Sequence, residues 1–506
     1  MSLTTMPDAH RPRPWELVFN IRRDEIAPVL VAALFFFFVL SALMVLRPAR
    51  DALGLERGIE SVRGLILVTA VATLAVNPLF GWLVSRLRRR QLIGATYGSL
   101  VLSLAGFWGL MEYAPGMVSQ ASSQVFYIWF NVFNLFATMV FWALLAERFT
   151  SEQGKRFFGL ISIGGTAGAI FGPWLTSELA ESLGTASLLL VAGSFLLLAM
   201  SSAWALLWIT PDRSTTGTGS GAAASPRAEE TARIGGSAWA GIHSVFRSAY
   251  LGGVAAYVML TAVMVTLVYF TRLQTVAGIA DGVDARAAML GRIDMWTHVV
   301  VLVLQLTLAG RIIKRFGLGV ALAILPAATA LGFIGLATFG SFAVLVLLEA
   351  LTRAVQRAIA QPARETLFTV VDREDKYKAK AFIDTFVYRA GDVAGAQTEG
   401  ALGRLGLAMG SLVSVVLPLA LVWMVLALWL GRAQSRRAMP QVLHAPRPAD
   451  SRRGVRRSSG APAGNATGAG GPARVHDGDP PQAHPPPARR ELPGTRLGAR
   501  PHGSSP

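Results

Sequence analysis

The sequence predicts an all-α, polytopic membrane protein whose 12 transmembrane helices form two pseudo-repeated six-helix bundles. Only 15% of the 506 residues are charged and 53% are hydrophobic, whereas about a quarter of the residues of an ordinary soluble domain are charged. Apolar runs of about 20 residues recur along the chain, the length that a helix needs to cross about 30 Å of hydrocarbon. A segment rich in Gly, Ser and Thr near the middle divides these runs six and six.

The apolar runs place twelve spans, of which the tenth and eleventh are the most polar. The first run is too long for a signal-peptide core and leads into Arg47 without a small-residue cleavage pattern, so we interpret it as a span. We expect spans at 27–46, 64–84, 92–111, 125–145, 158–177, 185–209, 250–270, 295–310, 318–336, 342–361, 381–402 and 407–430.

The central linker sets the expected domain boundaries. These are a cytoplasmic N-terminal segment (1–26), a first bundle (27–209), a cytoplasmic linker (210–249), a second bundle (250–430) and a disordered basic cytoplasmic tail (431–506). From Arg432 onward the chain has 13 Arg against four acidic residues, so this part supplies +9 of the net charge of +17. We expect a tail that is solvated or attracted to anionic lipid headgroups, with no specific nucleic acid as partner.

Loop charges indicate the orientation. All five lysines and several arginine clusters fall in connections on one side of the expected spans, which makes both termini cytoplasmic by the positive-inside rule. We therefore expect a multi-pass membrane protein with both termini on the cytoplasmic side, and a monomer. Two connections on the other side break the pattern: 47–63 contains four Arg and 271–293 contains three.

Several classes of function lack their motifs. The sequence has no G-x-x-x-x-G-K-[ST] loop, no H-E-x-x-H motif and no cysteine, and four of the seven His lie in the tail. We expect no catalytic residues, no metal site and no cofactor, so transport would be driven by gradients or exchange.

The two halves repeat weakly, as in many secondary transporters. The stretch "GWLVSRLRRR" at 81–90 aligns with "GRIIKRFGLG" at 310–319. Both resemble the cytoplasmic loop motif of the major facilitator superfamily, although Ser85 and Lys314 stand where that family has an acid. The resemblance implies gating loops formed by Gly81, Arg86, Arg89 and Arg90 in the first half and by Gly310, Arg315 and Gly317 in the second.

The fifth span carries "GLISIGGTAGAIFGP", which resembles the antiporter motif of the same superfamily but lacks its final Gly pair. Small residues four apart let helices pack closely. Helix packing alone and an antiporter role both remain open for Gly159, Gly168, Gly172 and Pro173.

A narrower resemblance covers most of the membrane part. "LRPARDALG", "FWALLAERFTSEQGKRFFGLISIGG" and "KYKAKAFIDTFVYRAGD" are similar to segments of the bacterial and plastidic ATP/ADP translocases and of their relatives in free-living bacteria. The resemblance matches Arg50 and Asp51 to a basic-acidic pair after the first span, where translocases have Lys, and Glu147 to a Glu that ends the fourth span. With these relatives we expect a protein of the bacterial inner membrane. Arg47, in the first of these segments, is a further residue of the predicted substrate pathway.

Charged residues inside the tenth and eleventh spans predict a polar cavity. Such residues are costly in hydrocarbon and normally face a bundle interior. Glu349, Arg353 and Arg357 follow one another at intervals of four residues, as do Asp384, Tyr388 and Asp392, and each set shares a helix face. With Arg389, and with Asn134 as a hydrogen-bonding candidate in the fourth span, these residues form the predicted pathway.

Three arginines in one cavity favour an anionic substrate, because a guanidinium binds phosphate or carboxylate through two parallel hydrogen bonds. We predict a secondary active transporter that moves or exchanges a small organic anion by alternating access, with a nucleotide as one candidate. The alternatives are an efflux antiporter for other small molecules, an integral-membrane enzyme using Glu147 or Asp384 as acid-base, and a sensor without transport. An ion-pair network that only locks helices together, or a proton relay through Asp384 or Asp392, would also explain the buried charges.

Overall fold

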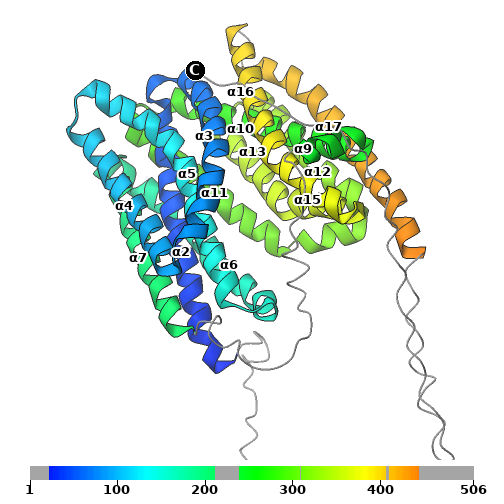
Figure 1. Ribbon diagram of the computed structural model, residues 1–506. Coiled ribbons are helices and arrows are strands. Elements are labelled where there is room, and N and C mark those ends of the chain that lie inside the picture. The colour runs from blue at the N-terminus through cyan, green and yellow to red at the C-terminus, as the bar shows by residue number, and fades with distance from the viewer. Residues whose placement is uncertain (1–21, 211–238, 308, 406–408, 444–506) are drawn as a thin grey trace, which may run out of the picture. The chain divides into compact units, whose positions relative to one another are not determined.

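A computed structural model describes residues 22–210, 239–307, 309–405 and 409–443, in which every regular element is helical (Figure 1). Most of the predicted N-terminal segment, linker and tail lies outside the described residues. The helices of the first half are α2 (Arg23–Gly54), η1 (Leu55–Arg57), α3 (Ile59–Arg86), α4 (Arg89–Tyr113), α5 (Gly116–Arg148), α6 (Ser151–Leu183) and α7 (Leu188–Ile209). Those of the second half are α9 (Trp239–Arg247), α10 (Ala249–Ile279), α11 (Val283–Thr307), α12 (Ala309–Phe339), α13 (Phe342–Val355), η3 (Gln356–Ala360), α14 (Gln361–Leu367), η4 (Phe368–Val370), α15 (Arg373–Phe382), η5 (Ile383–Val387), α16 (Tyr388–Arg404) and α17 (Met409–Leu443).

Within the described residues, 10 helices are long and apolar enough to cross a membrane. Two further helical stretches run without interruption from α13 through α14 and from α15 through α16, and they coincide with the predicted tenth and eleventh spans. Charged residues interrupt each apolar sequence, among them Glu349, Arg353 and Arg357 in the first stretch and Asp384, Arg389 and Asp392 in the second, as the sequence indicated. The all-α, polytopic fold is confirmed, and these two stretches agree with a total of twelve spans.

The two polar stretches each contain one π-helical turn, η3 and η5. A π-helix has i to i+5 hydrogen bonds and often occurs at functional sites. Arg357 lies in η3 and Asp384 lies in η5. Such a turn changes the angle between successive side chains, so the helical register before it differs from the register after it.

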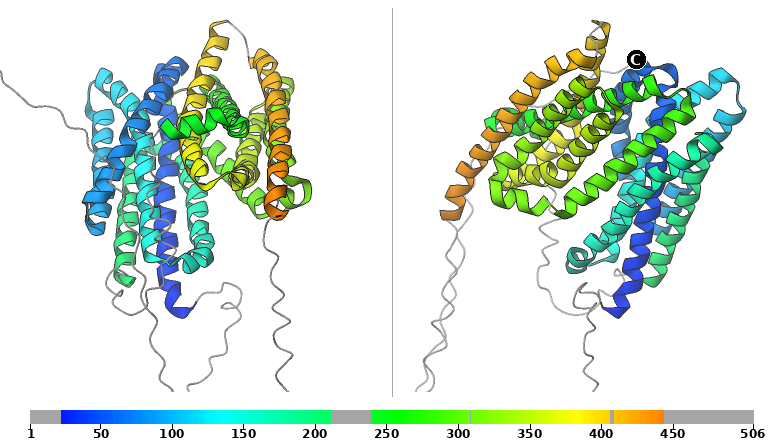
Figure 2. Two further views of the ribbon diagram at one scale, coloured as in Figure 1. Left: turned by 45° about the vertical axis from the view of Figure 1, so that its right-hand side comes forward. Right: turned by 180° about the vertical axis from the view of Figure 1, so that it is seen from behind.

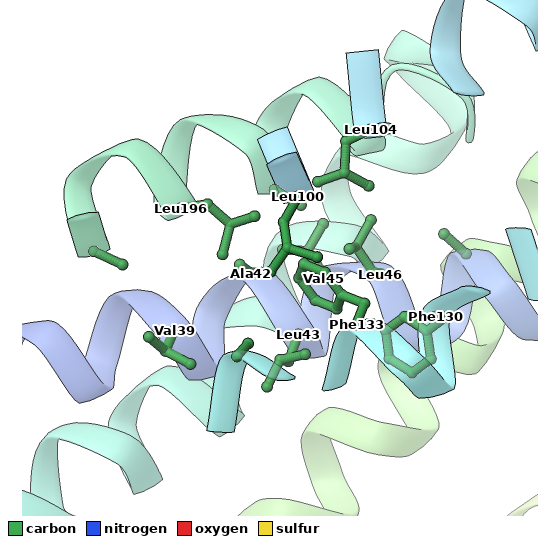
Figure 3. Close-up of a cluster of buried hydrophobic side chains, with 14 of the residues drawn as sticks. Val39, Ala42, Leu43, Val45, Leu46, Leu100, Leu104, Phe130, Phe133 and Leu196 are labelled. Carbon is green, nitrogen blue, oxygen red and sulfur yellow. The ribbon is translucent and has the colours of Figure 1, made fainter. Parts of the chain in front are cut away.

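The first half has a core of aromatic and aliphatic side chains from α2, α4, α5 and α7, part of which Figure 3 shows. Phe36 of α2 stacks on Phe141 of α5 with ring centroids 4.2 Å apart. Leu43 and Leu46 of α2 and Phe133 of α5 are buried in the same cluster. A central position for α2 follows, because it packs against α5, α6 and α7.

Close helix packing involves part of the predicted glycine motif. A Cβ at Gly168 would lie 2.4 Å from the carbonyl oxygen of Phe37, and one at Gly172 would lie 2.7 Å from that of Ser41. These two glycines therefore let α6 approach the backbone of α2. A Cβ at Gly159 would have no neighbour within 4 Å, and the carbonyl of Pro173 faces α11, 2.8 Å from a Cβ built at Gly291.

The second half has its own core around the fully buried Trp423 of α17 and Tyr257 of α10, whose rings are 5.8 Å apart. Figures 1 and 2 show α2 to α7 as one group of long helices and α12 to α17 as another. The end of α10 and the start of α11 belong to the hydrophobic cluster of the first half, and α11 contacts α2 and α6 as well as α13. These segments join the halves.

Several helices extend beyond the predicted spans. α2 continues to Gly54 and α3 begins at Ile59, so that Arg47, Arg50 and Arg63 are helical rather than part of a loop. α10 likewise continues past residue 270 to Ile279 and contains Arg272. The two connections that broke the positive-inside pattern are thus largely helix, and the arginines lower the local hydropathy enough to hide the helix ends. At the other end of the chain, α17 runs to Leu443, beyond residue 430.

The predicted gating-loop residues lie at helix ends. α3 ends at Arg86 and α4 begins at Arg89, with Arg86 and Arg90 exposed. Gly317 interrupts α12 with φ of 78° and ψ of 172°, a left-handed conformation that favours glycine. Arg315 beside it is exposed, and of Gly81, Arg89 and Gly310 only the helical backbone is described.

Candidate functional site

A cavity of about 460 Å³ lies between the two halves. Its volume is in the range of small-molecule sites in proteins. Helices α2, α3 and α5 line it from the first half, and α10, α13, η3 and α16 line it from the second. Its polar lining residues are Arg47, Arg50, Thr69, Tyr127, Asn131, Asn134, Thr266, Tyr269, Glu349, Thr352, Arg353, Gln356, Arg357, Tyr388, Arg389 and Asp392.

The cavity wall is rich in positive charge. Of the lining residues that the structure describes, five are arginines and two are carboxylates, Glu349 and Asp392. Arg357 forms no ion pair with any described carboxylate, and its side chain is exposed. A dry site could not keep this excess of like charge, so the cavity is suited to water or to an anion.

Behind the wall, an ion-pair network joins the halves. Arg353 contacts Glu349 and lies 3.0 Å from the Oδ1 of Asp294. Arg47 reaches the other oxygen of Asp294 at 3.7 Å. Asp294 is fully buried on α11, and a buried carboxylate is tolerated only when cations or hydrogen bonds compensate it.

A second part of the network centres on Asp51, which is fully buried and sits just behind the cavity lining. Arg50 bonds the Asp51 carboxylate while its guanidinium lies over the rings of Tyr127 and Phe130, at 4.8 and 5.0 Å. The hydroxyl of Tyr269 donates to Asp51 at 2.9 Å and lies 3.0 Å from the hydroxyl of Tyr127. The predicted Arg50–Asp51 pair thus reaches both halves.

On the opposite wall, Arg389 and Asp392 of α16 form an ion pair at 3.0 Å. Thr266 of α10 donates a weak hydrogen bond to Asp392 at 3.4 Å. Tyr388 lines the cavity beside them and also lines a smaller cavity of about 200 Å³ within the second half.

Nine of the twelve predicted pathway residues line the main cavity, and Asp51 lies directly behind it. The other two are elsewhere: Glu147 is near the end of α5, outside the lining, and Asp384 pairs with Arg364 at 3.3 Å. Asp384 lies four residues before Tyr388, about 6 Å away along the helix axis at 1.5 Å per residue, and at that level its carboxylate pairs with Arg364 instead of reaching the main cavity.

Sequence reasoning missed the centre of the network. Arg272 is fully buried and contacts Asp51, Asp294 and Glu349. The hydropathy pattern assigns Arg272 to the connection 271–293. The one sign of a special role was that this connection carries three arginines against the positive-inside rule. Tyr127, Tyr269 and Gln356 were missed because isolated aromatic and amide residues carry no pattern.

Polar contacts across the halves cluster at the ends where α2 and α10 finish and where α3 and α11 begin. Arg63 of α3 bonds Glu399 of α16 through two nitrogens, at 2.6 and 3.0 Å. The backbone and the hydroxyl of Thr185 both donate to Asp284 at 2.6 Å. We refer to this region, which includes these two contacts and the pair Arg272–Asp51, as the closed end. Within the described residues no cluster of His, Asp or Glu is arranged to hold a metal ion.

Two halves of membrane-spanning helices that enclose a polar cavity are the architecture of a secondary transporter. Residues 101–436 match the family model of the TLC ATP/ADP transporter. Since the match covers more than half of the chain, the protein belongs to the TLC ATP/ADP transporter family, and it is a secondary transporter of small organic molecules. The predicted resemblance to the ATP/ADP translocases is confirmed.

Solved structures with the same fold are transporters. A mutant of the nucleoside transporter NupG superimposes with a TM-score of 0.57 at 14% identity, covering 81% of this chain and 99% of that one. The D-xylose-proton symporter gives a TM-score of 0.55 at 13% identity, covering 79% of this chain and 96% of that one. At these identities the likeness concerns the fold alone. None of the curated proteins compared with the sequence matches it.

Proposed function

We propose that the protein exchanges a polyanionic organic solute across the membrane through the cavity between its halves, with nucleoside diphosphates and triphosphates as the first candidates. One observation carries the proposal: five arginines from both halves face a single cavity that holds two carboxylates. Guanidinium groups bind phosphate oxygens in pairs, and the family name is consistent with such a solute.

The cavity also suits the uncharged part of a nucleotide. Tyr127, Phe130 and Tyr269 present aromatic surface, and Asn131, Asn134 and Gln356 can hydrogen-bond a base or a sugar. The solute itself would be released without chemical change, since transport needs no covalent bond to be broken.

The orientation is part of the proposal. The distribution of lysine and arginine supports cytoplasmic termini. In a bacterial inner membrane the closed end would then lie on the outer side. The lipid bilayer and the solute are the expected partners of a monomeric carrier.

The test is uptake of labelled ADP into liposomes that contain the purified protein and are preloaded with ATP or ADP. Arg353→Ala and Arg389→Ala should each reduce exchange at least tenfold, because a charge-assisted hydrogen bond contributes about 1.5–3 kcal/mol. Uridine and D-xylose serve as uncharged controls that should not be taken up. Equal rates for wild type and both variants would remove the cavity from the pathway, and chemical analysis of the recovered solute would reveal any turnover.

A further inference from the structure

The network behind the cavity is organised around one arginine. Arg272 has no exposed side-chain surface, and its guanidinium contacts carboxylates on three other helices. These are Asp51 of α2, Asp294 of α11 at 2.7 Å and Glu349 of α13 at 3.0 Å. Arg272 itself is not part of the cavity lining.

Each of these carboxylates also holds an arginine of the cavity wall. Asp51 is bonded by Arg50, and Glu349 by Arg353. Asp294 is shared by Arg353 at 3.0 Å and Arg47 at 3.7 Å. Four guanidinium groups therefore share three carboxylates, and every carboxylate bridges Arg272 to a group that an anion in the cavity can reach.

The contact between Arg272 and Asp51 crosses from the second half to the first, at the closed end. The same end carries Tyr269, which is bonded to both Asp51 and Tyr127. The network is not saturated: Oδ2 of Asp294, Oε2 of Glu349 and Nε of Arg272 are buried without a hydrogen-bond partner. The two oxygens can accept further hydrogen bonds, and the nitrogen can donate one, when the network rearranges.

We infer that Arg272 is a positioning residue that couples occupancy of the cavity to opening of the closed end. This inference rests on the proposed anionic substrate. A bound polyanion competes with Asp51, Asp294 and Glu349 for Arg47, Arg50 and Arg353. The three carboxylates are then compensated mainly by one guanidinium, and in a buried site such a charge imbalance is costly. The bond across the halves weakens, and the closed end opens when the cavity is filled.

A cysteine reporter can measure this opening. The chain contains no cysteine, so Ala396→Cys introduces a single thiol. Ala396 lies on α16, is 1% exposed and packs in the core of the first half, so its thiol should react with a water-soluble maleimide only when the halves separate there. With the reporter alone, ADP should raise the labelling rate.

Two variants test the coupling. Arg272→Gln and, separately, the nearly isosteric Asp51→Asn should raise labelling without ADP by about tenfold, since a tenfold shift in an equilibrium corresponds to only about 1.4 kcal/mol. In both variants ADP should cause no further increase. If Arg272→Gln does not fold, Asp51→Asn alone decides, because it breaks the bond across the halves and leaves Arg272 with two carboxylates.

Arg63→Gln is the matched control. The Arg63–Glu399 pair also crosses the halves at the closed end, but it shares no carboxylate with the cavity arginines. This variant should raise basal labelling and keep the response to ADP. The inference is overturned if Arg272→Gln or Asp51→Asn retains the response to ADP. If neither ADP nor pyrophosphate changes the labelling rate of the reporter protein, the proposed substrate class is wrong. If Arg272→Gln and Asp51→Asn leave the labelling rate without ligand unchanged, Arg272 does not hold this end closed.

Discussion

Arg63 and Glu399 are separated by 336 residues in the sequence and form an ion pair with two hydrogen bonds, at 2.6 and 3.0 Å. The side chains are 7% and 5% exposed. Gln274 of α10 donates a further hydrogen bond to Glu399. The pair joins α3 to α16 in a nearly dry environment. Its loss therefore lowers the stability of the fold more than the loss of a surface salt bridge.

Breaking this pair should destabilise the protein. Loss of one partner of a buried ion pair costs about 3–5 kcal/mol, because the other charge stays buried without compensation. We expect Glu399→Gln to lower the Tm of the purified protein clearly. Glu60 also pairs with Arg63 but is 69% exposed, so Glu60→Gln is the control and should change Tm little. Similar shifts for both variants would contradict a special role of the buried pair.

The contact between α2 and α6 should not tolerate a side chain at Gly168. An added methyl group would lie 2.4 Å from the carbonyl oxygen of Phe37, and overpacking of a tight contact costs about 1–3 kcal/mol. Gly168→Ala should therefore lower Tm and the yield of folded protein. Gly159→Ala, on the same helix, meets nothing within 4 Å and should leave both unchanged. A stable Gly168→Ala protein would mean that α2 and α6 are further apart.

Arg357 should contribute to anion binding without supporting the fold. It lines the cavity and makes no ion pair with a described carboxylate, whereas Arg353 binds both Glu349 and Asp294. Arg357→Gln should weaken ADP binding about tenfold, equivalent to about 1.4 kcal/mol, with Tm unchanged. Arg353→Gln should lower both the affinity for ADP and Tm. Calorimetric titration and a thermal melt of each variant separate the two effects, and a lower Tm for Arg357→Gln would reveal a structural role.

Asp392 and Asp384 should differ in their effect on transport, although their spacing in the sequence predicts a shared helix face. Asp392 lines the main cavity and pairs with Arg389, whereas Asp384 pairs with Arg364 outside that lining. Asp392→Asn frees Arg389 to bind the substrate and should change the KM for ADP exchange by several-fold. Asp384→Asn should leave KM near the wild-type value. The reverse result would show that Asp384 faces the substrate.

The periodicity of the chain is enough to predict an all-α membrane protein and the charged residues that its tenth and eleventh spans contribute to the cavity wall. Hydropathy reports the cost of placing a helix in lipid, and intramembrane charges such as Arg353 and Asp392 must face a polar interior. The positions of these residues along two polar spans therefore indicate a cavity from the amino-acid sequence alone.

Tertiary structure decided which charges meet. Asp384 shares its helical stretch with Tyr388 and Asp392, but it pairs with Arg364 and lies outside the cavity lining, which its spacing in the sequence does not encode. The extended ends of α2 and α10 turn apparent loop arginines into helical residues, so that Arg47 and Arg50 line the cavity and Arg272 is fully buried. The only sequence signal of Arg272 is its place in a connection that breaks the charge rule. Its role is not visible there, because its partners Asp51, Asp294 and Glu349 come together only when four helices pack. An ion pair depends on distances of a few ångströms, and those distances exist only in the folded protein.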